Sequence, residues 1–198
     1  MYTALLANVA QYLTLTPSEQ AYVTSLLTAA HIPRFGYVLQ AGQPIRSLTF
    51  ITRGCVRTYA TDSQGKETVL SFAWEGWWCG DVASAVAGAP ATLTLQALEA
   101  TEVLHLSLER LEQLCARIPA FKRFFRLLFQ NAFLLEQRQR LALLHCPAAE
   151  RYARFCRQYP RLRQRVAQKY IASYLGMTPE FLSALRTRQK PGPFLKLA

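Results

Sequence analysis

The chain has 198 residues, of which 51% are hydrophobic, so it is long enough to bury one large core or two small ones. Its formal net charge of +11 is uneven, because residues 1–116 carry 6 Lys/Arg and 9 Asp/Glu, whereas residues 117–198 carry 17 and 3. The resulting balances of −3 and +14 predict a polyanionic partner for the second part only, with nucleic acid favoured over an anionic membrane surface.

Several classes of protein are not expected from the composition. There is no uninterrupted apolar run of about 18 residues, which argues against a membrane-spanning helix. The N-terminal stretch lacks both a basic start and a small-residue cleavage site, so we expect no signal peptide and a cytoplasmic location. The 5 cysteines and 3 histidines are widely scattered, and no catalytic set of side chains is recognisable. We therefore expect no disulfide framework, no metal, no cofactor and no enzymatic activity.

The predicted elements begin with a short helix over residues 16–30, in which Thr16 is the N-cap, Pro17 the first helical residue and Glu19 the third. Short β-rich runs follow, separated by recurrent glycines. The runs are YVLQ, SLTFIT, CVRTYAT, ETVLSFA, TLTLQALE and EVLHLSL. Such runs predict an antiparallel roll or barrel, with a hairpin loop at DSQGKE, residues 62–67.

From Ser107 onward the apolar periodicity is helical, and a long connecting helix is predicted over residues 119–145. Its apolar side chains step by four and three residues, a spacing typical of a seam between two helices. The seam consists of Phe121, Phe125, Leu128, Ala132 and Leu135. We expect this helix to pack on its own β domain and on the same helix of a second chain. The alternatives are a core helix of a monomer and a basic amphipathic membrane helix.

The segment QKYIASYLGMTPEFLSALRT, residues 168–187, predicts a helix-turn-helix. Ala172 is small where the second helix crosses the first, and Gly176 lies in the turn, where a positive φ favours glycine. Thr178 and Pro179 are suited to cap and begin the second helix. The alternative is a helical hairpin that closes a small domain without reading DNA.

If the second helix enters the major groove, its side chains divide into two groups. Glu180 is suited to accept a hydrogen bond from a cytosine amino group. The side chains expected to face bases are Thr178, Pro179, Glu180, Ser183, Ala184 and Thr187. The side chains expected to contact phosphates are Gln168, Lys169, Arg186 and Arg188.

This order of elements resembles the Crp/Fnr superfamily of bacterial transcription regulators. Residues 41–72, 96–106 and 168–183 carry the likeness, and the phrase KYIASYLGMTPE is similar to the Bacteroidetes-type branch. The resemblance implies an α+β fold with an N-terminal antiparallel β-roll, a cyclic-nucleotide-binding-like jelly roll. It also implies a homodimer that binds double-stranded DNA, with RNA polymerase as a candidate further partner.

We therefore expect three parts: a sensor-like β-roll with flanking helices at residues 1–118, a dimerisation helix at 119–145, and a helix-turn-helix domain at 146–198. Only 10 residues follow Arg188, so a reduced or absent wing is expected.

Two departures from the family pattern affect the predicted function. The phosphate-binding cassette of relatives that bind cyclic AMP has Gly-Glu and then Arg-Ser, whereas this chain has Gly80-Asp81 and Ala91-Thr92. Without the arginine a cyclic phosphate loses its main partner, so we expect no cyclic AMP binding. The candidate pocket for another small-molecule effector comprises Gly80, Asp81, Val82, Ala91 and Thr92.

In the predicted reader helix, Pro179 and Ala184 occupy positions where relatives often place arginines. Guanine contacts are then missing, and either a different target or modest specificity is expected. The alternative function is a small-molecule or cyclic-nucleotide binding module without sequence-specific DNA reading. A third possible function is that of an interaction protein whose basic helices bind another protein or a lipid.

Overall fold

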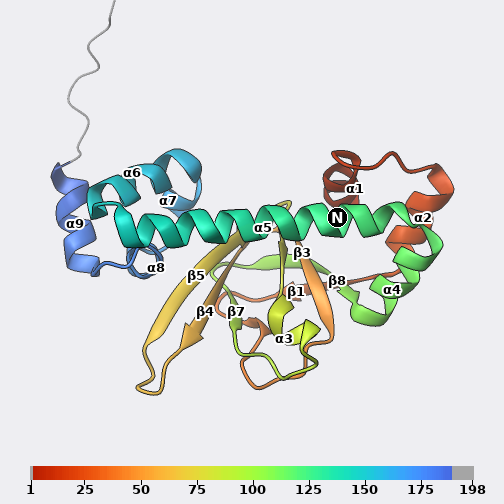
Figure 1. Ribbon diagram of the computed structural model, residues 1–198, viewed down its shortest axis with the longest axis horizontal. Coiled ribbons are helices and arrows are strands. Elements are labelled where there is room, and N and C mark those ends of the chain that lie inside the picture. Colours follow the sequence, from red (N-terminus) through yellow and green to blue (C-terminus); the bar gives the residue numbers. More distant parts are fainter. Residues whose placement is uncertain (1, 189–198) are drawn as a thin grey trace, which may run out of the picture. The chain divides into compact units, whose positions relative to one another are not determined.

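A computed structural model describes residues 2–188 of the chain (Figure 1). The chain forms two compact units, residues 1–134 and 135–198. The border between the units falls inside the long helix α5, Ala120–His145, which corresponds to the predicted connecting helix. Among the described residues, no helix combines the length and the apolarity that a bilayer crossing requires.

The first unit begins with helices α1, Tyr2–Ala10, and α2, Pro17–Ser25. The predicted capping box of α2 is confirmed: the Glu19 backbone N–H donates to Thr16 Oγ1 (3.3 Å) and the Thr16 N–H donates to Glu19 Oε2 (2.8 Å). The predicted end of this helix is wrong, because Leu27–Ile32 forms strand β1. Pairing of β1 with a distant strand overrides the helical propensity of this stretch.

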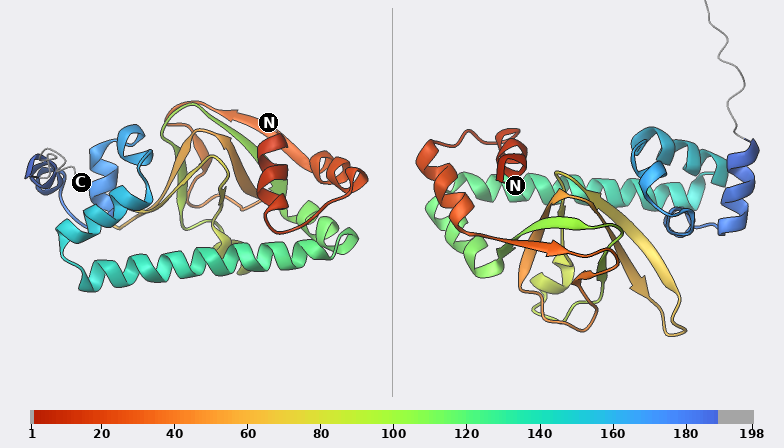
Figure 2. Two further views of the ribbon diagram at one scale, coloured as in Figure 1. Left: turned by 90° about the horizontal axis from the view of Figure 1, so that it is seen from above. Right: turned by 180° about the vertical axis from the view of Figure 1, so that it is seen from behind.

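Within residues 2–188, eight strands form two four-stranded antiparallel sheets, ordered β1-β8-β3-β6 and β2-β7-β4-β5. Figure 2 shows these strands curling into a roll, which confirms the predicted architecture. All six predicted runs form strands, whereas the short β6 and helix α3 were not predicted. Besides β1, the elements are β2 Tyr37–Leu39, β3 Ser47–Arg53, β4 Cys55–Thr61, β5 Glu67–Trp74, β6 Trp78–Cys79, α3 Val82–Val86, β7 Thr94–Ala97 and β8 Thr101–Ser107.

Two hydrophobic cores stabilise this unit. One lies between the sheets, where Ile51, Val56 and Val103 are fully buried. The other joins β3 and β8 to helices α1, α2, α5 and α4, Leu108–Arg117, and includes Phe121 and Phe124. The N-terminal part of α5 is therefore anchored by aromatic side chains on the helical side of the roll.

The predicted hairpin loop at residues 62–67 joins β4 to β5. Asp62 Oδ1 accepts hydrogen bonds from the backbone N–H groups of Gln64 (3.0 Å) and Lys66 (2.9 Å), and Gly65 has φ +80°. This side chain closes the loop in the way that turn aspartates commonly do. The hairpin prediction is confirmed.

The described part of the second unit, up to residue 188, consists of helices and turns. After α5 come α6 Ala148–Gln158, α7 Leu162–Arg165, α8 Gln168–Tyr174 and α9 Pro179–Arg188. Residues 160–165, which precede the helix-turn-helix motif, contain α7 and no strand. The prediction of a reduced or absent wing also concerns residues 189–198, which lie outside the described residues.

Candidate nucleic-acid interface and effector region

Helices α8 and α9 form the predicted helix-turn-helix. Ala172 has no exposed surface, as expected where two helices cross closely, and Gly176 has φ +63° in the turn. Leu182 of α9 is also fully buried, so one face of α9 is fixed on the unit. Glu180, Ser183 and Thr187 on the same helix are exposed.

The start of α9 is capped as predicted. Thr178 Oγ1 accepts a hydrogen bond from the Phe181 backbone N–H (3.2 Å), and Pro179 is the first helical residue. A cap of this kind satisfies an N–H group that the helix itself leaves unpaired. It also holds the first turn of α9 in a defined conformation, which a reading helix requires.

All the side chains expected to face bases are exposed. They are Thr178, Pro179, Glu180, Ser183, Ala184 and Thr187. The Thr187 hydroxyl donates to the Ser183 carbonyl oxygen (3.2 Å), so part of its hydrogen-bonding capacity is used within the helix. The structure brings these side chains together on one helix but contains no DNA, so their contacts with bases stay a prediction.

The residues expected to contact phosphates also lie close together. Arg186 Nη1 donates to Gln168 Oε1 (3.3 Å), and Gln168 Nε2 donates to the Pro179 carbonyl oxygen (3.1 Å). Gln168 therefore links the first turns of both helices. Lys169 Nζ lies 4.9 Å from the ring centre of Tyr170. The side chain of Arg188 lies outside the described residues.

Two features of this site were missed at the level of sequence. Phe181 is 50% exposed on α9, next in the chain to Glu180, which is expected to face bases. Arg151 on α6 donates through Nε to the Leu175 carbonyl oxygen (2.9 Å) and through Nη1 to the Cys146 carbonyl oxygen (2.7 Å). Arg151 thus holds the end of α8 from outside the motif, and no local pattern indicates a contact across 24 positions.

The candidate effector region is closed by its own side chains. Asp81 is the N-cap of α3, and its carboxylate accepts from the Ser84 N–H (3.2 Å) and hydroxyl (2.8 Å). The same carboxylate accepts from the Thr92 N–H (2.8 Å), the Thr92 hydroxyl (3.1 Å) and the Leu93 N–H (3.1 Å). The structure therefore brings Asp81 and Thr92 together and engages both within the loop.

Burial by itself would raise the pKa of the Asp81 carboxyl. The hydrogen bonds from Ser84, Thr92 and Leu93 outweigh burial, so the pKa is lowered overall. An ionised carboxylate with five donors has little capacity left for a sugar hydroxyl. A ligand that uses Asp81 must displace contacts that now hold the loop.

The other candidates in this region offer few polar groups. Ala91 is buried, and its backbone N–H donates to the Gln43 carbonyl oxygen (2.9 Å). Gly80 packs near Leu48, and Val82 begins α3. At the position of the missing arginine there is therefore a small buried side chain, and its backbone is already paired.

The predicted dimer seam on α5 needs correction. Phe121 and Phe125 are buried in the core of their own unit, so they are not available to a second chain. Leu128 packs partly on the same core, Leu135 is half-buried, and Ala132 is exposed. Four-and-three spacing could not distinguish a core face from a dimer face, because both require the same periodicity.

The exposed apolar side chains of α5 lie on a different stripe. The most exposed of them are Phe133 (62%), Leu134 (46%), Leu141 (57%) and Leu144 (71%). Leu134, Leu141 and Leu144 are seven and three positions apart, which places them on one side of a helix. We call these four residues the α5 stripe.

Known proteins resemble the chain in both sequence and structure. Residues 30–118 match the family described as cyclic nucleotide-binding domain. The Anaerobic regulatory protein of Pasteurella multocida is 29% identical over 167 residues, and the aligned part covers 78% of this chain. This chain spans about 60% of the length of that curated relative.

Two solved structures share the fold. FixK2 from Bradyrhizobium japonicum has a TM-score of 0.71 at 19% identity, covering 82% of this chain and 83% of its own. A protein of Eubacterium rectale assigned to the Crp/Fnr family has a TM-score of 0.69 at 16% identity, covering 88% and 83%. The shared fold comprises a β-rich N-terminal domain, a long helix and a helical C-terminal region.

Proposed function

We propose that the chain is a Crp/Fnr-type regulator that controls transcription by binding double-stranded DNA as a homodimer. The match of residues 30–118 to the cyclic nucleotide-binding domain and the similarity to the Pasteurella multocida regulatory protein support this proposal. The observation that carries this proposal is the α8–α9 pair, in which α9 is fixed through the buried Leu182 and exposes Glu180, Ser183 and Thr187. The relatives in curated collections are named as regulatory proteins, which supports the same activity.

In the proposed complex the first turns of α9 lie in the major groove. Glu180 accepts from a cytosine amino group, and Ser183 contacts a neighbouring base edge. Arg186, Gln168 and Lys169 contact phosphates and fix the orientation of the helix without reading sequence. The basic composition of the chain after residue 116 supports this arrangement.

We assign dimerisation to the α5 stripe. A helix that exposes four large apolar side chains in water gains free energy when a second helix covers them. Two copies paired along α5 place two α9 helices on one DNA duplex, and the expected target is a palindrome with half-sites about one helical turn apart.

The domain with the β-roll, residues 1–118, acts in this proposal as a sensor that does not use cyclic AMP. Two observations support that assignment: the Asp81 carboxylate already accepts hydrogen bonds from its own loop, and Ala91 is buried. Another small molecule is the effector, and it changes the population of DNA-binding conformations through residues 119–145 and 146–198. We also propose a cytoplasmic location, contact with RNA polymerase, and membership of the Bacteroidetes-type branch.

The test is a selection of random duplex DNA with the full chain and no added ligand, at moderate salt. Recovery of a palindrome supports a homodimer that reads DNA without an effector. A Thr178→Ala, Glu180→Ala double variant is the matched control, because it removes the cap and one proposed base contact. If the double variant recovers the same palindrome as the parent, the proposed reading by α9 is wrong.

The match of residues 30–118 to the cyclic nucleotide-binding domain favours one alternative function, a nucleotide-binding module that does not read sequence. Titration calorimetry of the full chain with cyclic AMP separates the two. Binding of cyclic AMP that is lost in an Asp81→Ala variant supports the alternative and contradicts our assignment of the sensor.

A further inference from the structure

A groove of about 440 Å³ lies within the second compact unit. One wall is a face of α5, the other is a face of α6, and the end of α8 closes the bottom. Its lining residues are Leu135, Arg138, Gln139, Ala142, Arg151, Arg154, Phe155, Arg157, Gln158, Tyr159, Tyr174 and Leu175. The volume is in the range of sites that bind small organic ligands. None of the lining residues belongs to α9.

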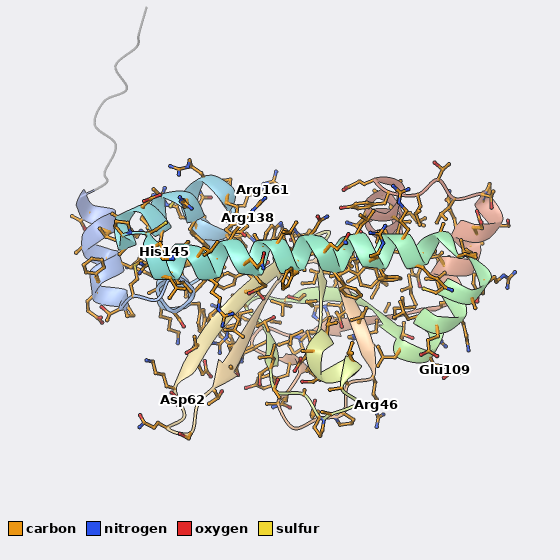
Figure 3. The ribbon with its side chains drawn as sticks, viewed as in Figure 1. Arg46, Asp62, Glu109, Arg138, His145 and Arg161 are labelled. Atoms are coloured by element: carbon orange, nitrogen blue, oxygen red, sulfur yellow. The ribbon has the colours of Figure 1, made fainter. Side chains whose placement is uncertain are left out.

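The charge of this groove is mainly positive. Its lining contains four arginines and no acidic residue, whereas burial and the nearby Glu136 carboxylate of α5 both raise the pKa of the lining residues Tyr159 and Tyr174. Arg154 is paired with Glu150 (2.8 Å), and Arg151 donates to carbonyl oxygens, which carry no net charge. For Arg138, labelled on α5 in Figure 3, and for Arg157, no hydrogen bond or ion pair is found among the described residues. Cations gathered around a hollow attract an anion.

The remaining lining of the groove is mostly apolar or aromatic. Leu135 and Ala142 come from α5, and Phe155 and Tyr159 come from α6. Phe155 and Tyr159 form an edge-to-face pair with ring centres 5.4 Å apart. Contacts of a duplex with phosphates need only surface cations, whereas an apolar wall beside the cations suits the body of an organic molecule.

We propose that this groove binds a small organic phosphate, with Arg138 and Arg157 holding the phosphate from opposite walls. A guanidinium donates two parallel hydrogen bonds to a phosphate, which makes arginine well suited to this role. The apolar side chains of α5 and α6 then cover the organic part. This site is separate from the candidate effector region around Asp81.

The groove is connected to the helix-turn-helix by hydrogen bonds. Arg151 lines the groove and donates to the carbonyl oxygens of Leu175 (2.9 Å) and Gly176 (3.4 Å) at the turn. Gln139 also lines it and donates to the Tyr174 carbonyl oxygen (3.0 Å). A ligand among these side chains changes the conformational freedom of the turn before α9. This effect on DNA affinity rests on the proposed function, whereas ligand binding does not.

The experiment is titration calorimetry of the full chain with two probes, adenosine 5′-diphosphate and inorganic pyrophosphate, without DNA. We expect the organic diphosphate to bind more tightly than pyrophosphate, because only the former covers the apolar wall. In the double variant Arg138→Ala, Arg157→Ala, affinity for adenosine 5′-diphosphate is expected to fall about tenfold or more. Arg161→Ala is the matched control, because this exposed arginine of the same unit does not line the groove.

Three results overturn the proposal. One is that neither probe binds, and another is that the double variant binds as tightly as the parent. Equal affinity for the two probes overturns the assignment of the apolar wall to an organic body. The same proteins are then titrated with a duplex of random sequence. If the double variant loses duplex affinity while the parent binds neither probe, Arg138 and Arg157 contact DNA phosphates instead.

The two proposals fail independently. Loss of probe binding in the double variant supports the proposed ligand site in the groove, even when the selection from random duplex DNA recovers no palindrome. Conversely, a recovered palindrome without probe binding supports DNA reading and overturns the groove.

Discussion

The carboxylate of Asp81 accepts two hydrogen bonds from Thr92, one from its backbone N–H (2.8 Å) and one from its hydroxyl (3.1 Å). These bonds span 11 positions of the chain and close the loop that contains α3. The loop is therefore held closed by its own aspartate.

The first prediction concerns this aspartate and pH. Asp81→Asn is expected to lower the free energy of unfolding by about 1–3 kcal/mol near neutral pH, because an amide cannot accept five hydrogen bonds. The folded-state pKa of Asp81 is lowered from its ordinary value of 3.8, so its stabilising contribution is present above that value. This contribution is lost as the pH falls through the lower, folded-state pKa.

The measurement is urea unfolding of the parent and the variant from pH 7 to acid. The difference in unfolding free energy should be constant near neutral pH and shrink below pH 3.8. A difference that stays constant throughout would contradict the assigned role of the ionised carboxylate.

The second prediction compares two glycines of the roll. A Cβ on Gly54 would lie 2.7 Å from Thr101 Cα, and Gly54 has φ +106°, so Gly54→Ala is expected to cost about 2 kcal/mol or more. Gly65 also has positive φ (+80°), but a Cβ added there would have no neighbour within 4 Å. Gly65→Ala is therefore expected to lower the free energy of unfolding by only about 1 kcal/mol. Thermal unfolding of both variants checks this order, and equal losses would show that backbone conformation alone decides.

The third prediction separates base reading from phosphate contact. Glu180→Ala is expected to relax preference at one base pair of each half-site while leaving the salt dependence of binding unchanged. Arg186→Ala is expected to weaken binding to all sequences and to make the salt slope shallower by about one. Competition binding against single-base variants of the selected site, at several salt concentrations, distinguishes the two. Identical behaviour of the two variants would mean that α9 is placed differently on DNA.

The fourth prediction concerns the α5 stripe. The double variant Phe133→Glu, Leu141→Glu is expected to be monomeric, because it places four carboxylates in a paired apolar seam. Lys122→Glu changes the net charge by the same two units at another exposed position of α5 and is expected to remain dimeric. Sedimentation velocity of the parent and both variants measures the oligomeric state. If the double variant is still a dimer, the α5 stripe is not the dimer interface.

The sequence predicted well those features that depend on local chemistry. The cap of α2 by Thr16, the cap of α9 by Thr178 and the turn at Gly176 all depend on side chains within a few positions. The six β-rich runs were also recognised, because glycine turns separate them and β-branched and aromatic residues occupy them.

The features that were missed depend on contacts between distant positions. Residues 27–30 of strand β1 were predicted as helix because their partners on β8 lie 73–79 positions away along the chain. The dimer seam was placed on Phe121 and Phe125 because burial against the roll leaves no separate periodicity in the sequence. The hydrogen bonds from Arg151 on α6 reach the turn before α9, and no sequence motif predicts such a contact.

Helix α5 is continuous across the border between the two units, which falls between Leu134 and Leu135. Each residue of an α-helix adds about 100° of rotation and about 1.5 Å of length. One residue inserted between Leu134 and Leu135 would therefore turn every later side chain of α5 by about 100° about the helix axis relative to the earlier ones, and Leu141 and Leu144 would no longer share a side with Leu134. The count of residues along α5 is thus what keeps the α5 stripe on one side of the helix.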